Sequence, residues 1–162
     1  MLQPLFQWME AQAVYGSSPY IGPIVNLLHL LSMVVFAGAL LIVDLRLLGL
    51  GLREQPLWQI ARDARPWLIG GLAGIVLTGI PQTMERATDQ YETSIFWMKM
   101  YLILFGLVWM ATVRRRAVRV DQPSGGWPKM VGLISIVVWG SVAALARLIM
   151  LLPANAFEFI VG

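Results

Sequence analysis

Residues 21–50 read IGPIVNLLHLLSMVVFAGALLIVDLRLLGL, and this stretch decides the fold. Nearly every side chain in it is apolar, and its only two charged residues, Asp44 and Arg46, stand close to its end. About 20 consecutive apolar residues are enough for a helix to cross the hydrocarbon core of a bilayer. The stretch therefore predicts a transmembrane helix that begins near Ile21 and ends near Leu50.

Three further segments, at about 58–80, 95–113 and 130–152, are apolar enough to form transmembrane helices. The most apolar part of the first of these, from about Trp67 to Ile80, is short for a crossing. We therefore expect the helix to extend back through Ile60 and Trp58, with Pro66 at a kink. Pro81 is expected to end that helix, because proline cannot donate the backbone hydrogen bond that a continuing helix needs.

The composition supports the same class of protein. Hydrophobic residues make up 58% of the 162 residues and charged residues 13%, whereas soluble domains average about 45–50% and about 25%. We therefore predict an all-α integral membrane protein in which residues 1–162 form a single four-transmembrane-helix bundle. A large aqueous domain, a nucleotide-binding fold and a disulfide scaffold are excluded. The absence of Cys also excludes thiolate metal sites and c-type haem, and the single His excludes a multi-histidine metal site within one chain.

Residues 1–16 predict a short amphipathic helix that lies on the membrane surface. Apolar and polar side chains recur there at helical spacing, and a turn follows at residues 16–19. The alternative is a frayed terminus. The apolar positions are Leu2, Leu5, Phe6, Met9 and Ala13, and the polar positions are Gln3, Gln7, Glu10 and Gln12.

Basic residues are concentrated in the loops after the first and third predicted helices. Because basic loops remain in the cytoplasm, we expect both termini to lie outside, in a bacterial inner membrane. The formal net charge of +3 then reflects orientation rather than nucleic-acid binding. The acidic loop after the second helix is expected to be solvated, with a cation site as the alternative. The basic residues at or beyond the inner helix ends are Arg46, Arg53, Arg62, Arg65, Arg114, Arg115, Arg116, Arg119 and Lys129, and the acidic loop carries Glu85, Asp89 and Glu92.

An ionisable residue inside a transmembrane helix is costly and marks a candidate functional site. Asp44 and Arg46 stand near the inner end of the first helix, where we expect an interfacial pair that snorkels or bridges to a neighbouring helix. Lys99 is either a site residue or a side chain that snorkels to the outer headgroups. Arg147 follows small residues within 140–144, and because such stripes mark tight helix contacts, we expect it to point inward.

His29 is the candidate metal ligand. Its imidazole suits the iron of haem b, provided that it points into an apolar slot lined by small residues. Gly70, Gly74 and Thr78 are expected to share one face of the second helix and to line that slot. The alternatives are a neutral imidazole hydrogen-bonded across helices or, with Met33 one turn later, a copper(I) site.

Three basic residues are expected in the same outer half of the bilayer: Lys99, Arg147 and Arg86. Haem propionates need cationic partners at the membrane edge, so these residues are candidate cofactor-binding side chains. A quinone headgroup or a lipid phosphate would accept the same cations. A quinone therefore stays open beside haem b.

Several strings of sequence, in this order, resemble a bacterial membrane family known as domain of unknown function 6644. They cover about residues 25–151 and comprise HLLSMVVFAGALLIVDLRLLGL from His29, then Arg65-Pro66-Trp67, Thr78-Gly79, Phe96 with Lys99, and Ala146-Arg147. The resemblance implies a four-helix membrane bundle without an established activity. That family is remotely similar to haem-associated and copper-resistance four-helix membrane proteins that carry a histidine early in the first helix. Where the family usually has glycine before the last arginine, this chain has Ala146.

Two functional hypotheses follow from these observations. In the first, the chain is a small electron-transfer subunit that binds haem b or a quinone, with His29 as ligand and with Lys99 and Arg147 as anchors for acidic groups. In the second, it is a non-catalytic accessory subunit that contacts other integral membrane subunits, further copies of itself and membrane lipids. A single histidine disfavours the six-coordinate bis-histidine haem expected for fast electron transfer. A homodimer that shares one haem, a Met ligand or a five-coordinate haem would still allow the first hypothesis.

Overall fold

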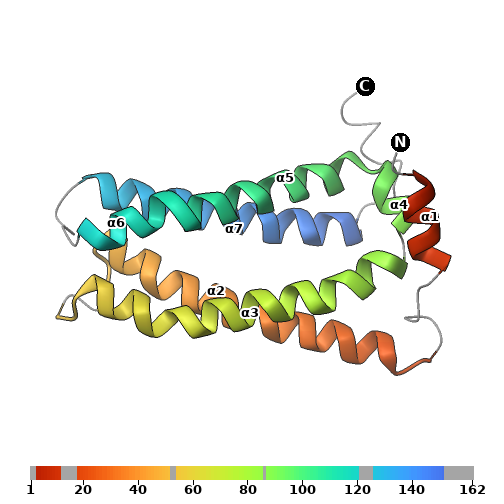
Figure 1. Cartoon of the computed structure of the whole chain (residues 1–162), viewed down its shortest axis with the longest axis horizontal. Helices are drawn as coiled ribbons and strands as arrows, with labels where there is room; N and C mark the ends of the chain where they lie inside the picture. The colour runs from red at the N-terminus through yellow and green to blue at the C-terminus, as the bar shows by residue number, and fades with distance from the viewer. Residues whose placement is uncertain (1–2, 12–17, 52–53, 86, 121–125, 152–162) are drawn as a thin grey trace.

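The computed structural model describes residues 3–11, 18–51, 54–85, 87–120 and 126–151, and within these ranges the chain is helical, without strands (Figure 1). Four spans are long and apolar enough to cross a membrane. They are α2 (Ile21–Leu48), α3 (Leu57–Glu85), a third span that begins with α5 (Ser94–Trp109), and α7 (Gly126–Leu151). The predicted all-α four-helix membrane bundle is confirmed.

Two short helices lie together at one end of this bundle (Figure 1). They are α1 (Gln3–Ala11) and α4 (Ala87–Glu92), and they pack against each other. The third span ends in α6 (Arg115–Val120) at the opposite end of the bundle. We refer to these as the α4 end and the α6 end.

The short N-terminal helix α1 packs against α4 and the start of α5. Phe6 of α1 is buried, its ring centroid 4.9 Å from that of Tyr91 and 6.2 Å from that of Phe96. Glu10 accepts hydrogen bonds from the backbone N–H of Thr88, at 3.1 Å, and from its hydroxyl. The predicted helix at residues 1–16 is therefore present over Gln3–Ala11, whereas residues 1–2 and 12–16 lie outside the described residues.

The first span ends two residues earlier than predicted, at Leu48. Gly49 follows with a positive φ of 78°. Its N–H donates to the Arg46 carbonyl at 3.0 Å, and the N–H of Leu50 donates to the Leu45 carbonyl at 2.9 Å. This pair of bonds satisfies carbonyl groups that the end of a helix leaves open, and the left-handed conformation that it needs costs glycine little.

The second span does not end at Pro81, so that prediction was wrong. The helix α3 continues through Pro81 to Glu85. A proline inside a transmembrane helix is tolerated when nearby hydroxyl groups and neighbouring helices satisfy the backbone groups around it. Pro81 cannot donate to the carbonyl of Leu77, four residues earlier. The hydroxyls of Thr78 and Thr83 add hydrogen bonds to the helix on either side, to the carbonyls of Gly74 at 2.5 Å and Gly79 at 2.9 Å.

The third span is also longer than predicted. A π-helical turn, η2 (Met110–Arg114), joins α5 to α6 without a break, so helix extends beyond the expected end at Val113. A π-turn accommodates one extra residue and rotates the side chains that follow it. Arg114 is buried, whereas Arg115 and Arg116 are exposed.

Packing differs sharply between the two ends of the bundle. The main hydrophobic core lies toward the α6 end, where α2, α3, α6 and α7 meet. No residue of α2 before Phe36, no described side chain of α7 after Val138 and no residue of α3 after Gly71 is buried. The helices α2 and α3 pack along each other, α7 packs against both α2 and α5, and α3 meets the third span through α6. The core consists of Phe36, Ala39, Leu40, Val43, Leu47, Leu57, Ile60, Ala64, Leu68, Ala117 and Val131.

Candidate functional site

A hydrogen bond between α2 and α3 fixes the position of His29. The imidazole Nδ1 lies 2.8 Å from Thr78 Oγ1. Because the only proton of that hydroxyl is donated to the Gly74 carbonyl at 2.5 Å, the hydroxyl oxygen accepts from His29, and Nδ1 is the protonated ring nitrogen. This tautomer leaves the lone pair of Nε2 free to accept a hydrogen bond or to bind a metal.

Gln82 adds an unsatisfied donor to the same face of α3. It follows Thr78 by one helical turn, so the two side chains lie one above the other. The side-chain nitrogen Nε2 is buried and has no hydrogen-bond partner among the described residues. A buried polar group without a partner costs about 1–3 kcal/mol, so this nitrogen is suited to donate to an acceptor group of a ligand.

Lys99 provides the positive charge on this side of the bundle. It lies in α5 and is half-buried, with Nζ 5.2 Å from the centroid of the Phe96 ring. Lys99 lies in the second turn of α5 and His29 in the third turn of α2, so both lie in the half of the bundle toward the α4 end (Figure 1). We call His29, Thr78, Gln82 and Lys99 the His29 cluster.

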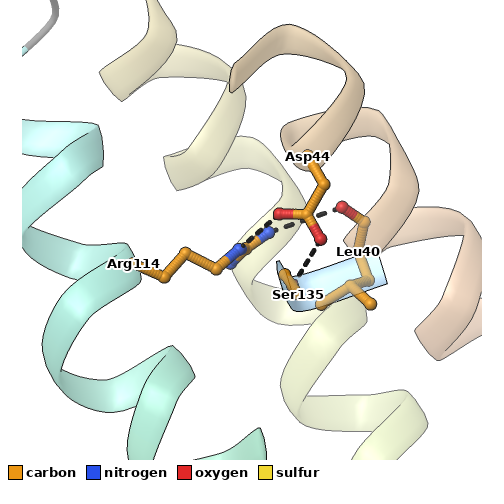
Figure 2. A network of polar contacts seen from close by, with 4 residues as sticks. All are labelled: Leu40, Asp44, Arg114 and Ser135. Carbon is orange, nitrogen blue, oxygen red and sulfur yellow. Dashed lines mark hydrogen bonds and ion pairs between the residues drawn. The ribbon is translucent and has the colours of Figure 1, made fainter. Parts of the chain in front are cut away.

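A second polar cluster lies in the core, toward the α6 end (Figure 2). Arg114 Nε donates to Asp44 Oδ1 at 2.8 Å, and Ser135 Oγ donates to Asp44 Oδ2 at 2.6 Å. Arg114 Nη2 also donates to the Leu40 carbonyl at 3.4 Å. Three spans thus contribute one side chain each, and both carboxylate oxygens are satisfied. We call Asp44, Arg114 and Ser135 the Asp44 cluster.

The predicted pair of Asp44 and Arg46 does not form a unit. Asp44 is fully buried and bridges to a neighbouring helix, as one of the two predicted alternatives required, but its partner is Arg114. The guanidinium of Arg46 instead donates to the Gln55 carbonyl, at 3.3 Å from Nε and 3.1 Å from Nη2. The prediction that Arg114 lies in a loop was wrong, because the π-turn carries the helix past it.

A comparison with protein families places the chain. The model of a family described as Family of unknown function (DUF6644) matches residues 6–151. This protein belongs to DUF6644. No curated protein and no solved structure matches the chain. The matched residues contain all four long helices and both polar clusters of the DUF6644 protein, and the resemblance found in its sequence is confirmed.

The glycines of α3 take up another role than the one predicted. An added Cβ at Gly71 would stand 2.7 Å from the backbone nitrogen of Phe36, and one at Gly74 would overlap the hydroxyl of Ser32. Both glycines therefore allow α2 to approach α3 closely, and α2 fills the face predicted as a slot. Gly70 does not share this face: it is exposed, with no heavy atom within 4 Å of an added Cβ, because it lies about 100° around the helix from Gly71.

Arg147 does not point into the bundle, and the prediction that it does was wrong. The side chain is exposed, as are Gly140 and Ala144 on the same stripe of α7. The buried face of α7 is a different one, marked by Ser135 and Val138. Small residues alone thus do not identify the packed face of a helix in this DUF6644 protein.

The remaining predicted site residues are quickly placed. Arg86 lies outside the described residues. Met33, proposed as a partner of His29 for copper, is half-buried one turn further along α2. Over the described ranges, no group of three or more His, Cys, Asp or Glu residues is arranged to hold a metal ion. The acidic residues Glu85, Asp89 and Glu92 are all exposed, as expected for a solvated segment.

Gln82 and Arg114 are the polar residues that the sequence reasoning missed. For Gln82 the available signal was its spacing of four residues from Thr78, which matters only if the helix continues past Pro81. For Arg114 the signal was Asp44, because a carboxylate in a transmembrane helix requires a partner.

Proposed function

We propose that this DUF6644 protein is a small membrane subunit that binds a quinone at the His29 cluster. The observation that carries the proposal is the buried, unpartnered Nε2 of Gln82, one turn from the Thr78 hydroxyl that orients His29. A quinone headgroup presents two carbonyl oxygens, and Lys99 Nζ and Gln82 Nε2 are donors that suit them. The free Nε2 of His29 is an acceptor for the hydroxyl group of a reduced quinone.

The packing of the bundle supports the location. The His29 cluster lies in the half where α2 and α3 carry no buried residues, so these helices are packed less tightly there than at the α6 end. Because α3 meets the third span through α6, we place the isoprenoid tail of the ligand between α3 and α5. There the tail would stay in contact with the acyl chains of the bilayer.

Haem b is the second candidate, and one observation favours it. A histidine that donates from Nδ1 to a fixed acceptor and keeps Nε2 free has the arrangement of a metal-binding imidazole with an orienting partner. The glycine face of α3 fits haem poorly, because Ser32 and Phe36 occupy it. Haem would therefore have to contact His29 from the side of α5 and α7, and Lys99 would be its cationic partner.

We also propose that the α6 end faces the cytoplasm of a bacterial inner membrane. Arginines are concentrated at that end, on α6 and on the first turns of α3, and the acidic residues of α3 and α4 lie near the other end. Basic segments remain on the cytoplasmic side. The His29 cluster then lies in the outer half of the bilayer.

The test is the cofactor content of the full chain, purified from membranes in mild detergent. Solvent extraction followed by chromatography measures quinone, and the visible spectrum measures haem through its Soret band. We expect bound quinone in the wild-type protein, about fivefold less in Gln82→Leu if one hydrogen bond is lost, and less still in Lys99→Met. The matched control is Gln59→Leu, which removes an exposed glutamine of the same helix at the α6 end.

The outcomes separate the candidates. A Soret band that disappears in His29→Ala would replace the quinone by haem b. Quinone content that is unchanged in both Gln82→Leu and Lys99→Met would reject the site. Purified protein with neither cofactor would favour the accessory subunit, which contacts other membrane proteins instead of carrying electrons.

A further inference from the structure

A groove runs along the outer surface of the α2–α3 pair, away from the His29 cluster. Its volume is about 450 Å³, and apolar side chains from Val34 to Ile42 on α2 and from Ile60 to Trp67 on α3 line most of it. Eight residues of helix span about 12 Å. Since α2 and α3 are both long and apolar enough to cross a membrane, this surface faces lipid.

The floor of the groove is open at Gly38. No heavy atom lies within 4 Å of the position that a Cβ would take there. Gly71 differs from Gly38, because it lies against the backbone of α2 and has no space for a side chain. The absence of a side chain at Gly38 therefore deepens the groove on the lipid side, where an acyl chain fits.

One charged residue, Asp63, lies among the described residues that line the groove. It is exposed and forms neither an ion pair nor a hydrogen bond with any residue that the structure describes. Arg62 and Arg65, its basic neighbours in sequence, point to other faces of α3, because each is 100–200° away around the helix. The groove thus presents a negative charge in the half of the bundle where basic residues predominate.

We propose that this groove binds one acyl chain of a phospholipid with a primary-amine headgroup, and that the carboxylate of Asp63 accepts hydrogen bonds from the ammonium group. The apolar walls select a lipid chain, and the charge of Asp63 selects its headgroup. A phospholipid with a glycerol headgroup has the same negative phosphate but no ammonium group that could pair with Asp63. This site is independent of the His29 cluster, and neither requires the other.

Native mass spectrometry of the full chain tests the proposal. The protein is released from micelles that contain phosphatidylethanolamine and phosphatidylglycerol in equal amounts, and the retained lipids are counted. We expect the amine lipid to be retained about two- to fivefold more, as for an exposed ion pair. Asp63→Asn should abolish this preference, and Gly38→Leu, which fills the groove, should reduce retention of both lipids.

Two matched variants serve as controls. Gly70→Leu adds the same side chain at another helical glycine with open space around it, and Glu54→Gln removes another exposed carboxylate near the α6 end. Both should retain lipid as the wild type does. Equal retention in Gly38→Leu and Gly70→Leu would overturn the groove as the binding site. An unchanged preference in Asp63→Asn would overturn the recognition of the amine. Thermal unfolding of each variant identifies any loss that is due to misfolding.

Discussion

Arg114 Nε lies 2.8 Å from Asp44 Oδ1, and the two side chains are 6% and 0% exposed. Breaking such a buried pair by removing one partner costs about 3–5 kcal/mol, because the other charge remains buried alone. We therefore expect Arg114→Met to lower the melting temperature in detergent by roughly 10 °C. The double variant Arg114→Met/Asp44→Leu should recover part of this loss. The pairing would be contradicted if the double variant lost as much stability as Arg114→Met and Asp44→Leu lose together, or more.

Ser135 satisfies the second oxygen of the same carboxylate, at 2.6 Å. Hydrogen bonds to charged groups contribute about 1.5–3 kcal/mol, so Ser135→Ala should destabilise the protein, though less than Arg114→Met. Ser141→Ala is the control, since Ser141 lies on the same helix and is half-buried. Both are measured by thermal unfolding. Equal effects of the two serine variants would mean that the bond to Asp44 contributes nothing.

Two adjacent glycines of α3 should respond in opposite ways to the same substitution. Gly71→Ala forces a Cβ against the backbone of Phe36, and overpacking of this kind costs about 1–3 kcal/mol. Gly70→Ala adds a methyl group in open space and should stabilise the helix by up to about 1 kcal/mol. The melting temperatures of the two variants test the close approach of α2 and α3. Equal shifts of the melting temperature in both variants would disprove it.

The contact between α1 and α4 should depend on pH through Glu10. Hydrogen bonds from the Thr88 side chain, and then from its backbone N–H, lower the pKa of Glu10 below its ordinary value. A lowered pKa in the folded state stabilises the contact above the ordinary carboxyl value, and this stabilisation is lost as the pH falls through the folded-state pKa. The protection factors of the α1 amides, which correct for the intrinsic pH dependence of exchange, should therefore fall at acidic pH. The dependence should vanish in Glu10→Gln and persist in the exposed control Asp89→Asn.

The orientation of the bundle is tested with a reporter fused after Gly162. Eight of the ten basic residues that the structure describes lie in the half of the bundle toward the α6 end, which we assign to the cytoplasm, so a reporter that works only outside the cytoplasm should be active there. Activity of a reporter that works only in the cytoplasm would invert the bundle and place the His29 cluster in the inner half of the bilayer.

The four spans could be predicted from sequence because hydropathy is a local property that twenty residues already determine. The Asp44 cluster could not, since its three side chains are brought together only when the third span continues through a π-turn to Arg114. Gln82 was hidden for a related reason, because a proline was taken to end its helix. The rotation of α3 about its own axis decides which of its glycines faces α2. Sequence periodicity alone does not give this rotation, and it predicted Gly70 on that face, where the structure has Gly71.

The uneven packing of the bundle has a consequence for its motion. An ion pair and the main core join the spans toward the α6 end. In the opposite half, the smaller buried cluster of Phe6, Ala87 and Phe96 joins α1, α4 and α5, and no described residue of α2, α3 or α7 is buried. Regions with few buried contacts separate at lower free energy than the core does. We therefore expect the helices to separate more readily around the His29 cluster than at the α6 end, which stays folded. Such an opening would give a lipophilic molecule a route from the bilayer to the cluster.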